Sequence, residues 1–353
     1  QPVVRAALLD VLGQVYRDLD LREEAKPLLE EALALRRTHL DPSDADLAES
    51  LLSLGLLAVD EGRFADARPL LESARTIHRV APVPDSAGLA RTLHSLGTLH
   101  MLEGRFDTAA VALQEAITLG RALGEREADL LASILDVFGA LHARQGNLAH
   151  AESLQAEVLA QRRLRLDPLH PELARSLNNL AGTRLRMGKL AAAESGYREA
   201  HGIWVRLHPV HGDVATVLNN LGAVLERQGR LVEAESAYRD ALAMKRQLFR
   251  GDDISLASSI GNLGLLLRRR GRLAEAERLL LESYAMRVRL RGPEHPDVAN
   301  SAMNLGRLYA ERGNQAQAIA WLEKALSIRR ARFGEDHAAT RAAAMALDSA
   351  RVK

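Results

Sequence analysis

The chain has 353 residues, enough for two or three ordinary domains or for one long repeat array. Hydrophobic residues make up 47% of it and aromatic residues only 3%, which argues against disorder and favours an Ala- and Leu-rich helical protein. Its 47 basic and 46 acidic residues give a net charge of +1, so no general attraction to nucleic acid or membrane is expected. The absence of cysteine excludes disulfides, thiolate catalysis and Cys-ligated zinc.

A Leu-Gly pair, or a close variant of it, recurs along the whole chain. Its second member lies at Gly13, Gly55, Gly97, Gly139, Ala181, Gly222, Gly264 and Gly306, in steps of 42 residues with a single step of 41. Seven residues later comes a turn residue, Asp20 in the first copy and glycine in the others, and five residues after that an alanine. This spacing predicts repeats at about 1–42, 43–84, 85–126, 127–168, 169–210, 211–251, 252–293 and 294–335.

Each repeat has the pattern of two amphipathic helices. In the sixth, the spacing of Val214, Val217, Leu221 and Leu225 predicts a first helix, Gly229 ends it, and a second helix follows. Pro-rich segments such as GPEHPD (292–297) separate the repeats. Residues 336–353 align with a ninth first helix, and their polar residues predict a terminal cap: Asp336, Arg341, Asp348 and Arg351.

Two segments, LGRLYAERGNQAQAIAWLEKA (305–325) and LGAVLERQGRLVEAESAYRDA (221–241), resemble the tetratricopeptide repeat (TPR) family. The 42-residue period resembles the longer TPR variety of kinesin light chains and many bacterial signalling proteins. The resemblance covers nearly the whole chain and implies a single all-α domain over 1–353, a right-handed α-solenoid superhelix of eight TPR repeats with a capping helix. The opening residues 1–19 are also similar to the start of repeat tails on bacterial receptor-like kinases and signalling ATPases.

Asparagine recurs just before Leu-Gly or Leu-Ala in the last four repeats, although it is a mediocre helix former. Asn179, Asn220, Asn262 and Asn304 follow a line beside the apolar stripe of each first helix. By the TPR resemblance this line faces a concave groove, where amides could hold the backbone of an extended peptide. The alternative is that the asparagines bond to neighbouring helices in the stack, and Asn178 and Asn219 are expected to be stack-facing or exposed.

Arginines share this line in repeats five to eight, where five of them stand against one acidic residue, Glu311, when the helix-start residue Asp213 is not counted. The first four repeats have no such excess, so the predicted groove is basic toward its C-terminal end and should select acidic side chains or a carboxylate. The predicted peptide-binding residues are Arg175, Asn179, Arg186, Asn220, Arg227, Asn262, Arg269, Asn300, Asn304 and Arg307.

Arginine runs at 36–37, 161–166, 287–291 and 329–333 fall at the ends of second helices. Cations complement the helix dipole there, so we interpret the runs as solvated helix ends and expect no nucleic-acid binding. Histidines recur in the loops between repeats without the spacing of metal ligands, so no metal site is expected: His208, His211, His295 and His337.

Trp204 takes the place held by Arg36 and Lys245 in other repeats, a position that we expect to be exposed. It lies beside the single shortened connection. We interpret the indole as filling space there, and the alternative is an anchor for a partner.

The first functional hypothesis is a non-enzymatic scaffold without cofactors that binds a protein or peptide partner, in a larger bacterial signalling protein of the cytoplasm. The composition, rich in Ala, Arg and Leu and free of cysteine, is compatible with that setting. The alternative is a structural spacer or a self-association arm. No nucleophile motif, phosphate-binding loop or membrane-spanning run is apparent, so neither catalysis nor a membrane partner is expected.

Overall fold

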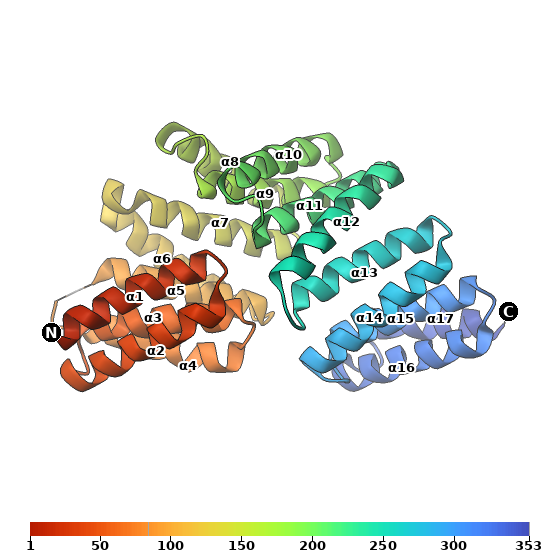
Figure 1. Cartoon of the computed structure of the whole chain (residues 1–353), viewed down its shortest axis with the longest axis horizontal. Coiled ribbons are helices and arrows are strands. Elements are labelled where there is room, and N and C mark those ends of the chain that lie inside the picture. The colour runs from red at the N-terminus through yellow and green to blue at the C-terminus, as the bar shows by residue number, and fades with distance from the viewer. Residues whose placement is uncertain (84, 353) are drawn as a thin grey trace. The chain divides into compact units, whose positions relative to one another are not determined.

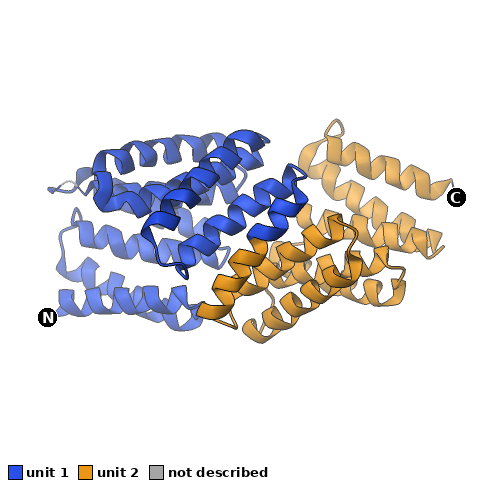
Figure 2. Ribbon diagram, turned by 90° about the horizontal axis from the view of Figure 1, so that it is seen from above, with its two compact units in different colours: residues 1–196 blue, residues 197–353 orange. Residues whose placement is uncertain are grey.

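The protein is described here by a computed structural model that covers residues 1–83 and 85–352. Within those residues it consists of seventeen α-helices and one short 3-10 helix, with no strand (Figure 1). The helices form two compact units, unit 1 (residues 1–196) and unit 2 (residues 197–353), coloured separately in Figure 2. The predicted all-α architecture of repeated helix pairs is therefore confirmed.

Unit 1 contains four complete helix pairs and the start of a fifth. Its helices are α1 (Pro2–Asp18), α2 (Arg22–His39), α3 (Ala45–Asp60), α4 (Phe64–Val80), α5 (Ser86–Leu102), α6 (Phe106–Leu123), α7 (Ala128–Arg144), α8 (Leu148–Arg165), α9 (Pro171–Arg186) and the beginning of α10 (Leu190–Leu207). A 3-10 helix, η1 (Gly124–Glu127), connects α6 to α7. Each first helix packs against its own second helix, and α1, α3, α5, α7 and α9 contact one another in sequence.

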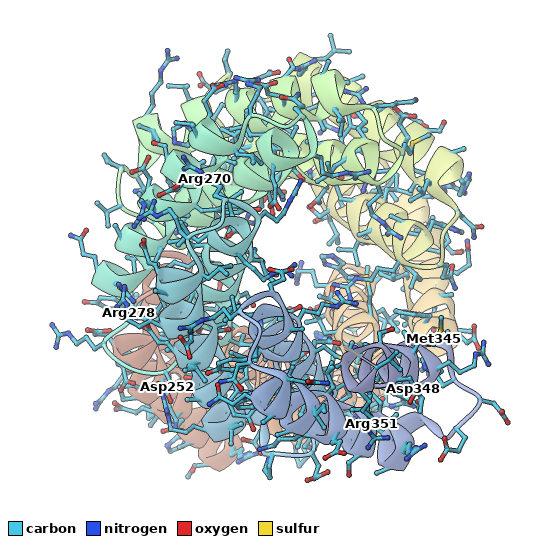
Figure 3. The ribbon with its side chains drawn as sticks, turned by 90° about the vertical axis from the view of Figure 1, so that its right-hand side faces the viewer. Asp252, Arg270, Arg278, Met345, Asp348 and Arg351 are labelled. Carbon is cyan, nitrogen blue, oxygen red and sulfur yellow. The ribbon has the colours of Figure 1, made fainter. Side chains whose placement is uncertain are left out.

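Unit 2 begins within α10 and continues the pattern of helix pairs. Its helices are α11 (Gly212–Arg227), α12 (Leu231–Leu248), α13 (Ile254–Arg269), α14 (Leu273–Arg291), α15 (Pro296–Glu311), α16 (Gln315–Phe333) and α17 (Ala338–Arg351). Second helix α12 packs on α13, and α14 on α15, so each pair contacts the next. The cap α17 packs on α16 and exposes Asp348 and Arg351, both labelled in Figure 3.

Small residues allow the two helices of a pair to approach closely. The eight periodic alanines from Ala25 to Ala318 all have 0% exposure. Opposite them, a Cβ added to Gly97 would lie 2.5 Å from Cγ of Leu113 on the facing helix, closer than van der Waals contact permits. In the fifth repeat the small residue is on the other side: Ala181 replaces the glycine, and Gly196 faces it.

The first helices end at the predicted turns, at residues whose backbone has a positive φ, the left-handed conformation. In the second repeat, the amide of Gly62 donates to the carbonyl of Val59, and the amide of Arg63 donates to that of Ala58. This hydrogen-bond pair needs a positive φ at its first member, which is 72° at Gly62. Asp20 replaces glycine in the first repeat and adopts a φ of 63°, a conformation that costs a non-glycine residue free energy.

Candidate functional site

The predicted peptide-binding residues are divided between the two units. Arg175, Asn179 and Arg186 lie on α9 of unit 1, and the other seven lie on α11, α13 and α15 of unit 2. Within unit 2, α13 contacts α15, and side chains of α11 bond to those of α13. The four line asparagines are half-buried, whereas the other members of the set are exposed: Arg175, Arg186, Arg227, Arg269, Asn300 and Arg307.

One asparagine of the line bonds to a neighbouring first helix. Nδ2 of Asn262, on α13, donates to Oδ1 of Asn219, on α11, over 3.2 Å. At this pair the asparagine of the line bonds to a neighbouring helix in the stack, which is the alternative to peptide binding given above. Asn219 therefore also contributes to the stacking of the helices. The bond occupies one donor of Asn262 and leaves its side-chain oxygen as an acceptor on the same face.

Most of the predicted cationic charge is already engaged within the protein. Nη1 of Arg269 lies 2.6 Å from Oε1 of Glu226, which also accepts from the hydroxyl of Tyr238 over 3.1 Å. On α9, Arg175 pairs with Glu172 over 2.8 Å, and Arg186 donates to a backbone carbonyl of α7. The line is therefore less basic than its own residues indicate, because the neutralising carboxylates lie just outside it.

A basic locus remains where α15 meets the end of α16. We call Asn300, Asn304, Arg307 and Arg329 the basic locus. Nη2 of Arg329 donates to Oδ1 of Asn300 over 2.9 Å, and Nη1 donates to the carbonyl of Ala339 over 2.8 Å. Burial lowers the pKa of Arg329, and the positive charge of nearby Arg307 lowers it further. Among the residues that the structure describes, no carboxylate lies within ion-pair distance of Arg307.

The sequence does not reveal the role of a recurring position near the end of the second helices, which is buried in four of its polar members and half-buried in Arg287 and Arg329. We call its polar members, six in all, the tie residues: Arg36, His78, Arg162, Lys245, Arg287 and Arg329. The guanidinium of Arg36 contacts Asp10 of its own repeat over 2.6 Å and donates to the hydroxyl of Ser50 in the next repeat over 2.8 Å. Each polar tie thus joins one helix pair to the first helix of the following pair.

The other ties make equivalent contacts ahead in the chain. Arg287 donates to the hydroxyl of Ser301 over 2.7 Å, and Lys245 donates to the carbonyl of Ser255 over 3.1 Å. Arg162 ion-pairs with Asp136 and donates to the hydroxyl of Ser176 over 2.5 Å. Burial raises the pKa of Asp136 to about 6, although Arg162 and Ser176 both oppose the rise.

Two predictions about these positions are wrong. Arg36 and Arg162 were interpreted as solvated helix ends but are only 5% and 2% exposed, because their charges are satisfied inside the repeat interface. The position shared by Arg36, Trp204 and Lys245 was expected to be exposed, yet all three residues are buried. Trp204 is 3% exposed and stacks on His211, with ring centroids 5.5 Å apart, so its indole belongs to the interior.

The tie of the second repeat is a histidine between two carboxylates. Nδ1 of His78 lies 3.4 Å from Asp85, and Nε2 lies 3.9 Å from Glu49. Burial lowers the pKa of His78, while the two carboxylates oppose the shift. One ligand atom from each of Glu49, His78 and Asp85 can be chosen so that all three lie within 4.8 Å of one another, a spacing that could hold a metal ion, and Glu49 also pairs with Arg91 over 2.7 Å.

The loop histidines cap helices. Nδ1 of His170, His211, His295 and His337 accepts a hydrogen bond from the amide two residues later, at 3.1–3.2 Å. An unprotonated ring nitrogen at the N-cap satisfies an amide that has no partner inside the helix. Capping explains why histidine recurs at this place in the period.

Within residues 1–83 and 85–352, none of the helices combines the length and the apolar character that crossing a membrane requires.

Known proteins share both the repeat and the architecture. A family model described as Tetratricopeptide repeat matches residues 4–79, 46–122, 130–203, 172–247 and 253–331, which together make up most of the chain. Among curated protein sequences, none matches. The crystal structure of BtubC (BKLC) from P. vanneervenii is 26% identical, with a TM-score of 0.53, and the similarity covers 66% of this chain and 92% of that chain.

Two further solved structures are similar over nearly the whole chain. A Rap protein complexed with Competence and Sporulation Factor is 11% identical, with a TM-score of 0.66, covering 98% of this chain and 97% of its own. A Signal Transduction ATPase with Numerous Domains with a tetratricopeptide repeat sensor, from Pyrococcus horikoshii, is 14% identical, with a TM-score of 0.60, covering 94% of this chain and 48% of its own. At these identities the similarity concerns the fold.

Proposed function

Because the chain belongs to the tetratricopeptide repeat family, in its kinesin-light-chain-like variety, we propose that it is a non-enzymatic scaffold that binds an extended acidic peptide segment of a partner protein. A protein-interaction scaffold is the role that the repeats support. We propose in addition that the peptide is acidic and that the chain is part of a bacterial signalling protein of the cytoplasm.

The observation that carries the proposal is the basic locus on unit 2. Arg307 is exposed and has no carboxylate partner among the described residues, while Arg329 donates to Asn300 and to the start of α17 and is near enough to be influenced by the charge of Arg307. Two cations that repel each other gain free energy when an anion lies between them, because a guanidinium binds a carboxylate through two parallel hydrogen bonds. The half-buried Asn304, one turn before Arg307, offers an amide to the peptide backbone.

The other predicted residues enter the proposal with smaller roles. Arg269 is paired with Glu226 and Arg175 with Glu172, so each would have to exchange an internal carboxylate for one of the peptide. Such an exchange brings little net affinity, because an exposed ion pair contributes only about 0–1 kcal/mol. We therefore propose charge selectivity at Arg307 and backbone recognition at the line asparagines of unit 2, Asn220, Asn262 and Asn304.

The experiment uses fluorescein-labelled peptides of about twelve residues that contain several glutamates, each compared with its glutamine version. We expect the acidic peptides to bind the whole chain more tightly in low salt than in high salt, since exposed charges are screened. Arg307→Ala should weaken this binding about fivefold or more, as for loss of a charged hydrogen bond.

Arg278→Ala is the matched control, because Arg278 is an exposed arginine of the same unit on the second helix α14, where Figure 3 labels it. This variant should bind the acidic peptides as the wild type does. Equal binding of glutamate and glutamine peptides, or an equal loss in the Arg307 and Arg278 variants, would refute the proposal.

A further inference from the structure

Three side chains of the kinds that bind metal ions meet where the second and third repeats join. Glu49 lies on α3, His78 lies near the end of α4, and Asp85 is the N-cap residue of α5. Ligand atoms of the three, one from each side chain, lie within 4.8 Å of one another. Because the residues come from three successive helices of unit 1, the packing of the repeats brings them together.

The imidazole of His78 is buried without a hydrogen bond. Its side chain has 0% exposure, and within the described residues neither Nδ1 nor Nε2 has a hydrogen-bond partner. The separation of 3.4 Å between Nδ1 and Oδ2 of Asp85 is within the range of an ion pair but lacks the geometry of a hydrogen bond. Buried polar atoms nearly always have a partner, so two unpaired nitrogens between two carboxylates indicate a place for a ligand.

The other tie residues bring a positive charge to this position. Arg36 donates to the backbone carbonyl ten residues ahead over 2.8 Å, and Lys245 and Arg329 do the same over 3.1 Å and 2.8 Å. An imidazole has no permanent charge, and in the described part of the chain His78 donates to no carbonyl. A bound cation would therefore supply at the second repeat what arginine or lysine supplies at the others.

Gly88 shapes one wall of the site. Its amide donates to Oδ1 of Asp85 over 2.8 Å, which orients the carboxylate with Oδ2 toward His78. A Cβ added to Gly88 would lie 2.2 Å from that Oδ2 and 2.4 Å from Cε1 of His78, so only glycine allows the two side chains to approach in this way. A hydrogen bond that orients a ligating carboxylate is typical of metal sites.

We infer that Glu49, His78 and Asp85 bind one divalent transition-metal ion, which joins the second repeat to the third. One imidazole nitrogen and two carboxylate oxygens suit zinc and ions like it, and water completes the coordination. Ligand atoms of tetrahedral zinc lie about 3.3 Å apart, so the three atoms must close by about 1.5 Å at most. The two carboxylates can make this movement, because their side chains are 27% and 28% exposed.

Arg91 competes with the ion for Glu49. Its Nη2 lies 2.7 Å from Oε1 of Glu49, the same oxygen that lies 3.9 Å from Nε2 of His78. The side chain of Arg91 is 40% exposed, so its guanidinium can turn to solvent when a divalent ion binds. Removing this guanidinium should therefore tighten metal binding, an effect that a purely structural role of His78 would not produce.

The first test is calorimetric titration of zinc chloride into the whole chain, freed of metal by a chelator and dialysis. We expect one zinc ion per chain with a Kd of about 10 μM or lower. His78→Gln should raise this Kd at least about tenfold, because even residues that only orient a ligand contribute that much. Glu49→Gln and Asp85→Asn should do the same while keeping the local structure, since glutamine can still accept from Arg91 and asparagine can still cap α5.

His150→Gln is the matched control. His150 is an exposed histidine of the same unit whose ring centroid lies 4.6 Å from that of His142, so these two histidines form a competing site for zinc. This variant should bind zinc as the wild type does. Arg91→Gln, in contrast, should lower the Kd about two- to fivefold, as for the loss of an exposed ion pair.

The second test is thermal unfolding with and without zinc. Zinc should raise the unfolding temperature of the wild type by about 2 °C or more and leave that of His78→Gln unchanged, because only the folded chain brings the ligands together. No zinc binding below about 1 mM, a Kd that His78→Gln leaves unchanged, a loss in His150→Gln instead, or no gain in Arg91→Gln would overturn the inference.

Discussion

Nη1 of Arg36 lies 2.6 Å from a carboxylate oxygen of Asp10, and both side chains are almost completely buried where α1, α2 and α3 meet. The same relationship returns three repeats later between Arg162 and Asp136. A buried ion pair is costly to desolvate, but removing one partner is costlier still, because the other charge remains in the interior. These ties therefore set how firmly successive helix pairs are joined.

Replacing the tie cation should destabilise the array strongly. We expect Arg36→Met to cost about 3–5 kcal/mol, because it leaves the Asp10 carboxylate buried without a cation. Arg37→Met is the control, since Arg37 is the exposed neighbour in the same helix, and it should cost less than about 0.5 kcal/mol. Urea unfolding followed by circular dichroism measures both. The double change Arg36→Met with Asp10→Leu should recover most of the loss; equal effects of the two single changes would contradict the role of the tie.

The asparagines should differ from one another in their effect on stability. Asn262→Ala removes the bond to Asn219 and should cost about 0.5–1.5 kcal/mol. For Asn304 no side-chain hydrogen bond is found among the described residues, so Asn304→Ala should be neutral or slightly stabilising, because alanine is the better helix former. Thermal unfolding of the two variants makes the comparison. If both lose stability alike, Asn304 also has a structural bond, and its role toward a peptide would have to be abandoned.

Stability should fall in mild acid because of His94 on α5. Burial lowers the pKa of this histidine to about 4, with Glu172 opposing the shift and Arg162 adding to it. Since the folded-state pKa is below the ordinary value of 6.5, the unfolded chain takes up the proton first as pH falls. The contribution of His94 is thus fully present above about pH 6.5 and is lost progressively toward about pH 4.

The raised pKa of Asp136 acts in the opposite direction over a similar range, so the test compares variants. Between about pH 7.5 and about pH 5, the unfolding temperature of His94→Leu should fall by less than that of the wild type. His39→Leu, at an exposed histidine that ends α2, should retain the wild-type pH dependence. Identical losses in the two variants would show that His94 does not carry the effect.

Two glycines within helices should respond to alanine with opposite signs. In Gly97→Ala the new Cβ would lie 2.5 Å from Cγ of Leu113, so we expect a loss of about 1–3 kcal/mol from overpacking. Gly202, on α10, has nothing within 4 Å of its added Cβ, and Gly202→Ala should gain about 0.5–1 kcal/mol from helix propensity. Urea unfolding of the two variants settles the comparison, and a gain at Gly97 would mean that the helices of this pair can separate without cost.

The helix pairs could be predicted from the sequence because the period of Gly13, Asp20 and Ala25 reports local geometry, namely a close helix contact and a left-handed turn. The tie residues could not be predicted, because Arg36 and Arg37 are adjacent residues of the same type at a helix end. Only their contact partners distinguish the buried arginine from the exposed one. The offset of fourteen residues from Arg36 to Ser50, repeated from Arg162 to Ser176, is the pattern that would have revealed them.

Only part of the candidate site could be predicted from the sequence, because here too the contact partners of a residue are not apparent from its own helix. The line of exposed residues follows from the sequence of each helix by itself, and that sequence does not reveal a partner on the preceding first helix. Glu226, which neutralises Arg269, lies on the preceding first helix and outside the line. Asn219 was expected to be stack-facing or exposed and bonds to Asn262, whereas Arg307 keeps the accessible charge that the line predicted for all its arginines.

The ties also bear on how a gene for such a chain can change in length. Each tie contacts only its own repeat and the first helix of the next one, at a fixed offset along the chain. Recombination between equivalent codons of two repeats would join a second helix to a different first helix, and the tie would keep its partner where that helix carries a serine at the receiving position, as at Ser50, Ser176 and Ser301. Loss or duplication of whole repeats therefore preserves a junction only where a tie meets a polar receiving residue, because Ile134 and Val217 hold that position in the fourth and sixth repeats and offer a tie cation no hydroxyl.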